Sequence, residues 1–426
     1  MNIDILIIGG GAAGMAAALE ANKYTKNILI IERDYELGGI LNQCIHDGFG
    51  LKEFKENLTG PEYANKYINL IQDNNIKYLL NTTVINIKNN FEVTLSNVEK
   101  GIFTIFSKAI ILTTGAYERT RGQIKLPGER PKGVLTAGSA QRYLNKDGYL
   151  VGKNVFILGS GDIGLIMARR MTLEGAKVLG IAEIMSYSNG LDRNIVQCLE
   201  DFNIPLYLSH TIKDIKGHPN LEEITIAKVD ENFDYIENTE KNFKVDTLLL
   251  SVGLLPDVEQ FNLKAKTDPK TKGFLVTQNY ETTIKNLYAA GNALHIHDLV
   301  DDVSIEAKKA GFYAANELNI NKPTNQPIKV ETHGLINYVI PQTLNNYEKN
   351  INFSFRVSKK IIQAQVKIFI NDALFRTRKF MNLIPAKMEN IKIIYDDINN
   401  LENIKLVLEE LSWENIFALY ALKAVS

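Results

Sequence analysis

Residues 4–32 have the sequence DILIIGGGAAGMAAALEANKYTKNILIIE, and they set the architecture of the chain. A short apolar run at 4–8 ends in glycines, an alanine-rich segment continues to about residue 24, and a second apolar run follows at 28–31. Short apolar runs favour buried strands, and the alanine-rich segment favours a helix. The sequence therefore predicts a strand, tight turn, helix and strand, which is the unit of a doubly wound dinucleotide-binding fold.

The turn of this unit contains a GxGxxG fingerprint made by Gly9, Gly11 and Gly14. The first glycine permits the tight turn, the second lets the backbone approach a pyrophosphate, and the third lets helix and strand pack closely. The N-terminus of the helix then offers N–H groups to the phosphates. Glu32 ends the second strand, where a carboxylate can accept hydrogen bonds from ribose hydroxyls. A glycine turn without a ligand is the alternative, and the strand, helix and acidic residue in register disfavour it.

The same order recurs from residue 154 to 184, so the chain has a second nucleotide-binding unit. Its fingerprint is Gly159, Gly161 and Gly164, and Glu183 ends its second strand. An acidic residue there favours a free 2′-hydroxyl and repels a 2′-phosphate. The stretch IAEIMSYSNG at 181–190 has no Arg or Lys, so the sequence predicts NADH over NADPH. A degenerate fold that binds no nucleotide is the alternative here.

The remaining segments predict three domains. Helical segments are expected at 51–75 and 303–318, and short strands at 77–97 and 101–107. From residue 325 onward, stretches such as NFSFRVS alternate with period two, which is typical of strands. The predicted fold class is α/β, with two interleaved Rossmann-like domains and a C-terminal mostly β domain. The inserted short strands before the return strand suit the larger, FAD-type version of the doubly wound fold. The predicted boundaries are 1–125 and 253–322 for this FAD-binding domain, 134–252 for the NAD(H)-binding domain, and 325–426 for the C-terminal domain.

Composition excludes several classes of function. The 426 residues include 45% hydrophobic and 23% charged residues with a net charge of −1, so no basic footprint for nucleic acid is visible. No apolar run is long enough for a spanning helix. Two cysteines are too few for a disulfide scaffold or a cluster held by four thiolates, and a cytoplasmic protein is expected.

Three further motifs carry a resemblance: TTG at 113–115, SVGLLPD at 251–257 and YAAGN at 288–292. With them, residues 1–322 resemble the two-dinucleotide-domain flavoproteins, the pyridine nucleotide-dependent reductases in which FAD and NAD domains are interleaved. The resemblance implies hydride transfer between NAD(H) and FAD. The FAD-binding residues that we predict are Gly9, Gly11, Ala13, Gly14, Glu32, Arg33, Gly38, Gly39, Asn42, Val84, Thr114, Gly115, Gly291, Asn292, Leu299 and Val300. The predicted NAD-binding residues are Gly159, Gly161, Asp162, Ile163, Gly164, Glu183 and Gly253.

A narrower resemblance covers most of the chain. The segments at 37–50, 113–145, 289–311 and 383–391 are similar to the nucleotide-binding subunits of opine oxidase and hydrogen cyanide synthase. They also resemble dehydrogenases associated with anaerobic glycerol-3-phosphate dehydrogenase-like partners. This resemblance implies a partner dehydrogenase or electron-transfer subunit, and it leaves a homo-oligomer open.

Cysteine positions argue against direct disulfide reduction. The superfamily's dithiol pairs are missing: Leu41 and His46 stand near one expected place, and TAGSAQRYLN at 136–145 stands at the other. Cys44, with His46 two residues on, is a candidate catalytic thiolate at the start of a helix, as in a self-contained NADH oxidase or peroxidase. The alternative, which we favour, is a packed residue lining the flavin site. Cys198 is given no role.

The histidines after YAAGN allow two interpretations. His295 and His297, with Asp298, Asp301 and Asp302, could form a metal site. The resemblance instead places this loop at the flavin pyrimidine ring, so we predict flavin contact and no metal, with a proton relay through His297 left open. The apolar segment at 414–426 is expected to pack in its own domain and not to attach to a membrane.

Overall fold

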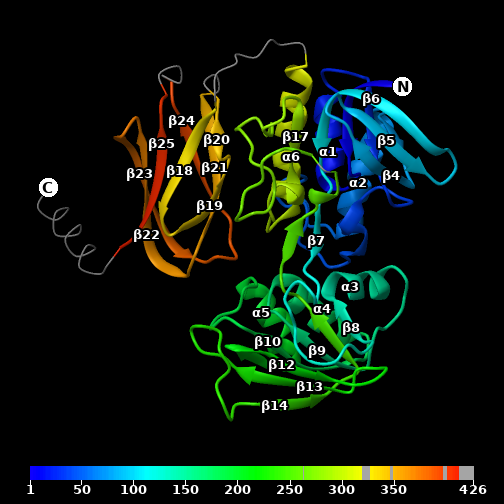
Figure 1. Cartoon of the computed structure of the whole chain (residues 1–426), viewed down its shortest axis with the longest axis vertical. Coiled ribbons are helices and arrows are strands. Elements are labelled where there is room, and N and C mark those ends of the chain that lie inside the picture. The colour runs from blue at the N-terminus through cyan, green and yellow to red at the C-terminus, as the bar shows by residue number, and fades with distance from the viewer. Residues whose placement is uncertain (262, 319–326, 346–348, 397–400, 412–426) are drawn as a thin grey trace, which may run out of the picture. The chain divides into compact units, whose positions relative to one another are not determined.

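The computed structural model describes the chain except residues 262, 319–326, 346–348, 397–400 and 412–426. The described chain divides into two compact units (Figure 1). The first unit contains residues 1–41, 47–115 and 256–426, and the second contains 42–46 and 116–255. The predicted fold class is confirmed, with two Rossmann-like α/β regions and a β-rich C-terminal region.

The first unit is built on a seven-stranded sheet of order β3-β2-β1-β6-β5-β4, with β17 paired to β6. Its strands β1, β2, β3 and β17 run parallel to their neighbours, as a dinucleotide-binding sheet requires. The bounds of its elements are β1 Asn2–Ile8, α1 Ala12–Ala21, β2 Ile28–Ile31, η1 Gly39–Gln43, α2 Gly60–Asp73, β3 Lys77–Leu79, β4 Thr82–Ile87, β5 Glu92–Asn97, β6 Gly101–Leu112, η3 Glu259–Phe261, β17 Leu287–Ala289, η4 Gly291–Ala293 and α6 Val300–Asn316.

Strand β6 is one continuous strand, although the sequence predicted a short strand at 101–107 and a separate apolar run. Its first part pairs antiparallel with β5, and Ile110–Leu112 pair in parallel with both β1 and β17. Helix α6 lies against α1, where a Cβ added to Gly311 would meet the Ala17 carbonyl oxygen at 2.3 Å. A glycine at this point therefore lets the two helices pack closely.

The helix predicted at 51–75 is shorter than expected. Helix α2 begins after Thr59, whose hydroxyl and the Glu62 carboxylate form a capping box. Residues 51–57 form turns instead, because Phe49 and Leu58 pair as an isolated bridge and Gly50 has a φ of 87°. The prediction for 51–59 was wrong, since turn chemistry around Gly50 overrides helical propensity there.

The second unit has a five-stranded parallel sheet of order β11-β10-β9-β15-β8 and a three-stranded antiparallel sheet of order β12-β13-β14. A two-stranded pair, β16-β7, accompanies them. The bounds are β7 Ala116–Glu118, β8 Val134–Thr136, α3 Ala137–Asn145, β9 Asn154–Leu158, α4 Asp162–Leu173, β10 Lys177–Glu183, α5 Asp192–Cys198, η2 Glu200–Phe202, β11 Leu206–Leu208, β12 His210–Lys216, β13 Glu223–Lys228, β14 Lys241–Lys244, β15 Thr247–Leu250 and β16 Leu254–Pro256.

The C-terminal region is β-rich, as its alternating sequence predicted. Its two sheets, of orders β20-β18-β25-β22-β23 and β19-β21-β24, share one core that includes Phe353, Phe355 and Val366. The predicted packing of residues 414–426 lies outside the described residues. The bounds are β18 Ile328–Gly334, β19 Ile336–Ile340, β20 Thr343–Leu344, β21 Asn350–Val357, β22 Ile361–Ile370, β23 Ala373–Leu383, β24 Glu389–Ile394 and β25 Ile404–Glu410.

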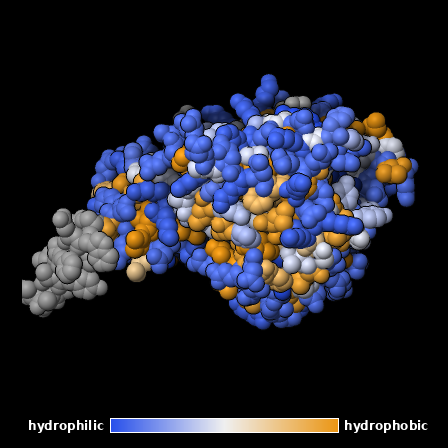
Figure 2. Space-filling view, turned by 90° about the horizontal axis from the view of Figure 1, so that it is seen from below, coloured by the Kyte–Doolittle hydropathy of each residue, from blue (hydrophilic) through white to orange (hydrophobic). Residues whose placement is uncertain are grey.

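Two observations concern the surface. Hydrophilic side chains cover much of the face seen in Figure 2, with apolar groups among them, which is normal for a globular protein. Within the part of the chain that the structure describes, every helix is too short or too polar to cross a membrane.

Candidate dinucleotide-binding sites

The first fingerprint forms a tight glycine turn between β1 and α1. Gly9 has a φ of 109°, and a Cβ there would meet the Thr113 carbonyl oxygen at 2.3 Å. A Cβ on Gly14 would lie 1.8 Å from the Gly9 carbonyl oxygen. The Thr113 hydroxyl donates to the carbonyl oxygens of Ile8 and Gly9, at 3.0 Å each. Both positions therefore exclude any residue larger than glycine.

The middle of this loop is open on the side that a phosphate would approach. Among the described residues, a Cβ added to Gly11 would touch the Gly38 carbonyl oxygen at 4.0 Å, and one at Gly115 would meet nothing within 4 Å. Gly11 is the N-cap residue of α1, and Ala13 lies in its first turn. These open glycines beside a helix N-terminus fit the pyrophosphate of a dinucleotide.

Glu32 is buried, and its carboxylate holds the loop. Its Oε2 accepts from the Gly10 N–H at 2.7 Å, and its Oε1 accepts from the Asp34 N–H at 2.8 Å. Each carboxylate oxygen has a second lone pair, so these bonds leave acceptor capacity for ribose hydroxyls. The predicted role of Glu32 stays a prediction, and the loop contact is an addition to it.

The other predicted FAD residues in this unit lie around the same loop or on the strands beside it. The Gly38 N–H donates to the Gly10 carbonyl oxygen at 2.9 Å, and a Cβ on Gly39 would lie 3.3 Å from the Gly11 Cα. The Thr114 hydroxyl donates to the Asp257 carbonyl oxygen at 2.6 Å.

Arg33 and Val84 have different surroundings. Arg33 is exposed and lies 3.9 Å from the Asp257 carboxylate. Val84 sits on β4, where it pairs with Leu95 and packs against the core. Their contacts with FAD remain predictions.

The second fingerprint repeats the same backbone geometry. Gly159 has a φ of 98°, and its added Cβ would meet the Ser251 carbonyl oxygen at 2.1 Å. A Cβ on Gly164 would lie 2.5 Å from the Gly159 carbonyl oxygen. An added Cβ on Gly161 or Gly253 would have room, because its nearest atom would lie at the ordinary van der Waals distance of 3.6 Å. This loop therefore also fits a pyrophosphate.

Side chains brace this second loop more heavily. The buried Glu183 Oε2 accepts from both the Ser160 N–H at 3.0 Å and the Ser160 hydroxyl at 2.7 Å. Asp162 Oδ1 accepts from the Leu191 N–H at 2.9 Å and from the Asn194 side-chain amide at 2.7 Å. The Asp162 carboxylate therefore anchors the start of α5, and its contact with NAD remains a prediction.

Ile163, in the first turn of α4, packs against the core of the second unit. A contact between Ile163 and NAD would thus come from its backbone, and it remains a prediction.

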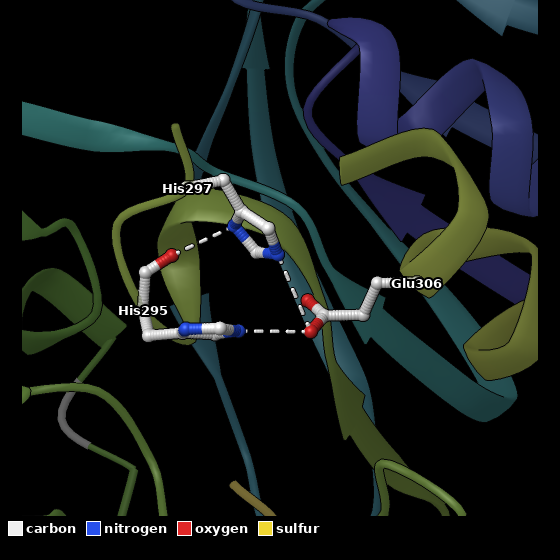
Figure 3. Close-up of side chains that lie close together, drawn as sticks. All are labelled: His295, His297 and Glu306. Atoms are coloured by element: carbon white, nitrogen blue, oxygen red, sulfur yellow. Dashed lines mark hydrogen bonds and ion pairs between the residues drawn. The ribbon is translucent and has the colours of Figure 1, made fainter. Parts of the chain in front are cut away.

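The loop after β17 is organised by Glu306, a residue that the sequence analysis missed. Its Oε1 accepts from the Gly291 N–H at 2.7 Å. Its Oε2 lies 2.9 Å from His295 Nε2 and 3.4 Å from His297 Nε2 (Figure 3). The Asn292 amide oxygen accepts from the His297 N–H at 3.0 Å, so the Asn292 side chain shapes the loop.

Burial and mutual charge shift the pKa values of these three groups. Burial lowers the pKa of His295, and the neighbouring His297 lowers it further. Although burial acts in the opposite direction, the Glu306 carboxylate raises the pKa of His297. The pKa of Glu306 lies well below its usual value because the two imidazoles outweigh its burial.

Asp301 and Asp302, which the sequence offered as metal ligands, have other partners. The Asp301 carboxylate accepts from the N–H groups of Gly50, Lys52 and Glu53 at 3.1, 3.0 and 2.8 Å, and Asp302 pairs with Lys52 at 2.8 Å. The carboxylate beside the imidazoles is Glu306 instead. Asp301 therefore fastens the 49–58 turn to α6 at its start, where Leu299 is the N-cap and Val300 the first residue.

Asp298 joins the loop to the C-terminal strands. Arg356 on β21 donates to the Asp298 carboxylate and to the Ile296 carbonyl oxygen, the latter at 3.0 Å. The Met388 N–H donates to the other Asp298 oxygen at 2.7 Å. Met388 belongs to the segment LIPAKMENI at 383–391, and Asp298 belongs to the segment at 289–311, so these two segments meet here.

Cys44 follows the short helix η1, and the expected start of a helix at this cysteine was wrong. Cys44 is half-buried, and its Sγ lies 3.9 Å from the Gln141 amide oxygen. Burial raises the pKa of its thiol to about 12, the opposite direction from that of a reactive thiolate. Asn42 and His46 are half-buried in the same 42–46 segment, and their roles stay predictions.

Two open glycine loops, each followed by a helix and a buried glutamate, define a protein with two dinucleotide-binding units, and the family match makes it an FAD-dependent pyridine nucleotide oxidoreductase. The family model described as pyridine nucleotide-disulphide oxidoreductase matches residues 3–361, and the chain belongs to this family.

The chain is similar to several proteins of known name. It is 26% identical to a thioredoxin reductase of Mycoplasma genitalium over 294 residues, covering 68% of this chain and 86% of that protein. It is 23% identical to the hydrogen cyanide synthase subunit HcnB of Pseudomonas protegens over 279 residues, covering 60% of this chain and 57% of that protein. The fold resembles a thioredoxin reductase structure from T. acidophilum, with a TM-score of 0.61, 24% identity and coverage of 74% and 98% of the two chains.

Proposed function

We propose that the chain transfers hydride between NADH and FAD and exchanges the electrons with a partner dehydrogenase subunit. The observation that carries the proposal is the pair of fingerprint loops, in which Gly11 and Gly161 leave room for a pyrophosphate. When bound, FAD supplies the redox chemistry, and the protein supplies position and electrostatics. We place this exchange in the cytoplasm, as expected for a chain with two cysteines.

The preference for NADH over NADPH rests on Glu183. Its carboxylate is buried at the end of β10, and the following residues to 190 contain no Arg or Lys. A 2′-phosphate placed beside it would meet negative charge without compensation. Anaerobic addition of NADH or NADPH, followed by flavin absorbance, tests this point. Bleaching by NADPH at concentrations equal to or below those of NADH would overturn it.

The proposal of a partner subunit rests on the absence of a CxxC pair from the sequence and on the name of one relative. Neither of its two cysteines is part of a CxxC pair, so direct dithiol chemistry has no support in the sequence. The relative HcnB is by name a subunit. We expect the native protein to co-purify with a second polypeptide from its own source. Full turnover with a small acceptor by a protein that runs alone in native extract would count against a partner.

The alternative is an NADH oxidase or peroxidase that uses Cys44. The raised pKa of the Cys44 thiol weighs against this alternative. Cys44→Ser separates the two functions, with Cys198→Ser as the matched control. NADH-dependent oxygen or peroxide consumption that is equal in both variants removes the alternative, and a selective loss in the first would establish it.

A further inference from the structure

We infer that His295, His297 and Glu306 form a proton-binding site that takes up one proton, at His295 Nδ1, when the flavin is reduced. The inference rests on the proposed function, since it requires FAD in the first unit. It assigns a chemical task to three side chains that the cofactor-binding fingerprints do not use.

Hydrogen bonding fixes the protonation state of His297. Its Nδ1 lies 3.0 Å from the His295 carbonyl oxygen and 3.3 Å from the Asn292 amide oxygen, and its Nε2 lies 3.4 Å from Glu306 Oε2. All three partners are acceptors, because Asn292 Oδ1 already receives the His297 N–H. We therefore assign a proton to each ring nitrogen, which makes His297 an imidazolium paired with the Glu306 carboxylate.

His295 has a different pattern. Its Nε2 lies 2.9 Å from the Glu306 carboxylate and therefore carries a proton. Its Nδ1 is buried and has no hydrogen-bond partner among the described residues. His295 is 1% exposed, so this lone pair is an unused acceptor inside the protein. A buried acceptor without a partner is uncommon and calls for an explanation. Here it leaves His295 neutral with one position ready for a proton.

The three groups connect to the predicted FAD loop through Gly291. Glu306 uses its second oxygen to accept the Gly291 N–H at 2.7 Å. Gly291 has a φ of 71°, and a Cβ added to it would lie 2.9 Å from the Cβ of Ala13, in the first turn of α1. The Gly291 backbone, which Glu306 holds by this hydrogen bond, therefore lies so close to the first fingerprint that a side chain at Gly291 would meet Ala13.

The charge balance gives the direction of proton movement. NADH loses a hydride to become NAD⁺, and the flavin that accepts it gains two electrons and one proton, so one negative charge is left uncompensated. His297 and Glu306 together are neutral, and His295 adds no charge. A proton from solvent that binds His295 Nδ1 makes the three groups carry one positive charge, which compensates the added electron charge. The electrons stay on the flavin, and the histidine changes its protonation alone.

Other charged or titratable groups face the site from each element packed on it. Arg356 opposes a positive charge on His295, and Asp298 favours one on His297. The Tyr338 ring lies 6.3 Å from the His295 ring. The groups to be considered in any pH dependence are Glu306 and Lys309 on α6, Asp298 in the loop, Arg356 on β21, Tyr338 on β19, and Tyr280 in the segment before β17.

The experiment measures the midpoint potential of the bound flavin against pH in the full chain. Each proton taken up with two electrons shifts the potential by about 30 mV for a tenfold change in proton concentration. We expect a slope of about 60 mV per pH unit near neutrality in the native protein and about 30 mV in His295→Gln. A pH indicator in weak buffer gives a second measurement: about one proton consumed per flavin reduced by NADH in the native protein, and none in the variant.

His333→Gln is the matched control, because His333 is exposed on β18. It should keep the native slope. Native-like flavin absorbance and melting temperature show that a variant is folded. A slope that stays at about 60 mV in His295→Gln, or a native slope already at about 30 mV, overturns the inference. Absence of bound FAD, or of bleaching by NADH, would instead refute the proposed function.

Discussion

The two glycine loops share a backbone but differ in the side chains that hold them. Gly9 and Gly159 both turn with positive φ against a carbonyl oxygen, from Thr113 in one unit and Ser251 in the other. In the first loop, Glu32 holds a backbone N–H at Gly10. In the second loop, Glu183 holds both the N–H and the hydroxyl of Ser160. Turn geometry is therefore common to both sites, and the polar bracing is specific to each.

Alanine at the third glycine should break the shared geometry with the largest effect. In Gly14→Ala the new Cβ would lie 1.8 Å from a carbonyl oxygen, against 2.5 Å in Gly164→Ala. Overpacking of this kind costs about 1–3 kcal/mol or more. We expect Gly14→Ala to purify without FAD, and Gly164→Ala to keep FAD but respond weakly to NADH.

Gly122→Ala is the control for both, because an added Cβ there would meet its nearest atom at 3.9 Å. Flavin content by absorbance and bleaching by NADH are the measurements. Normal FAD content in Gly14→Ala would contradict the shared geometry.

Replacing each glutamate by glutamine should weaken the binding of one cofactor without affecting the other. In Glu183→Gln an amide replaces a carboxylate that accepts from Ser160 and Met185. An unsatisfied buried donor costs about 1–3 kcal/mol, so we expect the KM for NADH to rise about tenfold or more with FAD content unchanged. Glu32→Gln should weaken FAD binding instead. Equal effects of both variants on both cofactors would show that the loops are not independent.

Exchanges at the second position of each fingerprint, Gly10 and Ser160, test the same difference between the two loops with a smaller expected effect. Ser160→Gly removes one hydroxyl that donates at 2.7 Å, which should cost about 1 kcal/mol and raise the KM for NADH several-fold. Gly10→Ser should be the more damaging exchange, because its Cβ would lie 2.5 Å from Cδ2 of the buried Leu37 and 3.2 Å from the Cβ of Glu32, which cannot both move away easily. Steady-state kinetics measure the KM for NADH in Ser160→Gly, and a flavin titration measures the FAD dissociation constant of Gly10→Ser. A Gly10→Ser protein with native FAD affinity would contradict this asymmetry.

The smallest expected effect is a pH dependence confined to the first unit. The pKa of His297 is raised above 6.5, so its pairing with Glu306 stabilises the fold below pH 6.5. That stability is lost as the pH rises through the folded-state pKa. The melting temperature of the native protein should exceed that of His297→Gln by a few degrees at pH 6, and by less at pH 9. A difference that grows with pH would contradict the assignment.

The sequence predicted the parts of the fold that depend on backbone geometry. Gly9 and Gly159 lie in the predicted turns, and Gly14 and Gly164 lie in the helices that follow, at places where an added Cβ would meet a backbone carbonyl oxygen. The segment at 51–57 was missed because the turn at Gly50 is held by the distant Asp301. Glu306 was missed for a similar reason: it is 15 residues beyond Gly291 on an ordinary helix, and no local pattern marks it. Long-range polar contacts of this kind leave no signal in spacing.

Arg356 bears on the design of a shortened chain that lacks the C-terminal strands. Removing the β21 strand would take away the guanidinium that serves both the Ile296 carbonyl and the Asp298 carboxylate. A shortened protein would keep both glycine turns and yet lose the clamp on the histidine segment. We therefore expect a shortened protein to hold its histidine segment in place only if it retains these strands or supplies another cation at the position of Arg356.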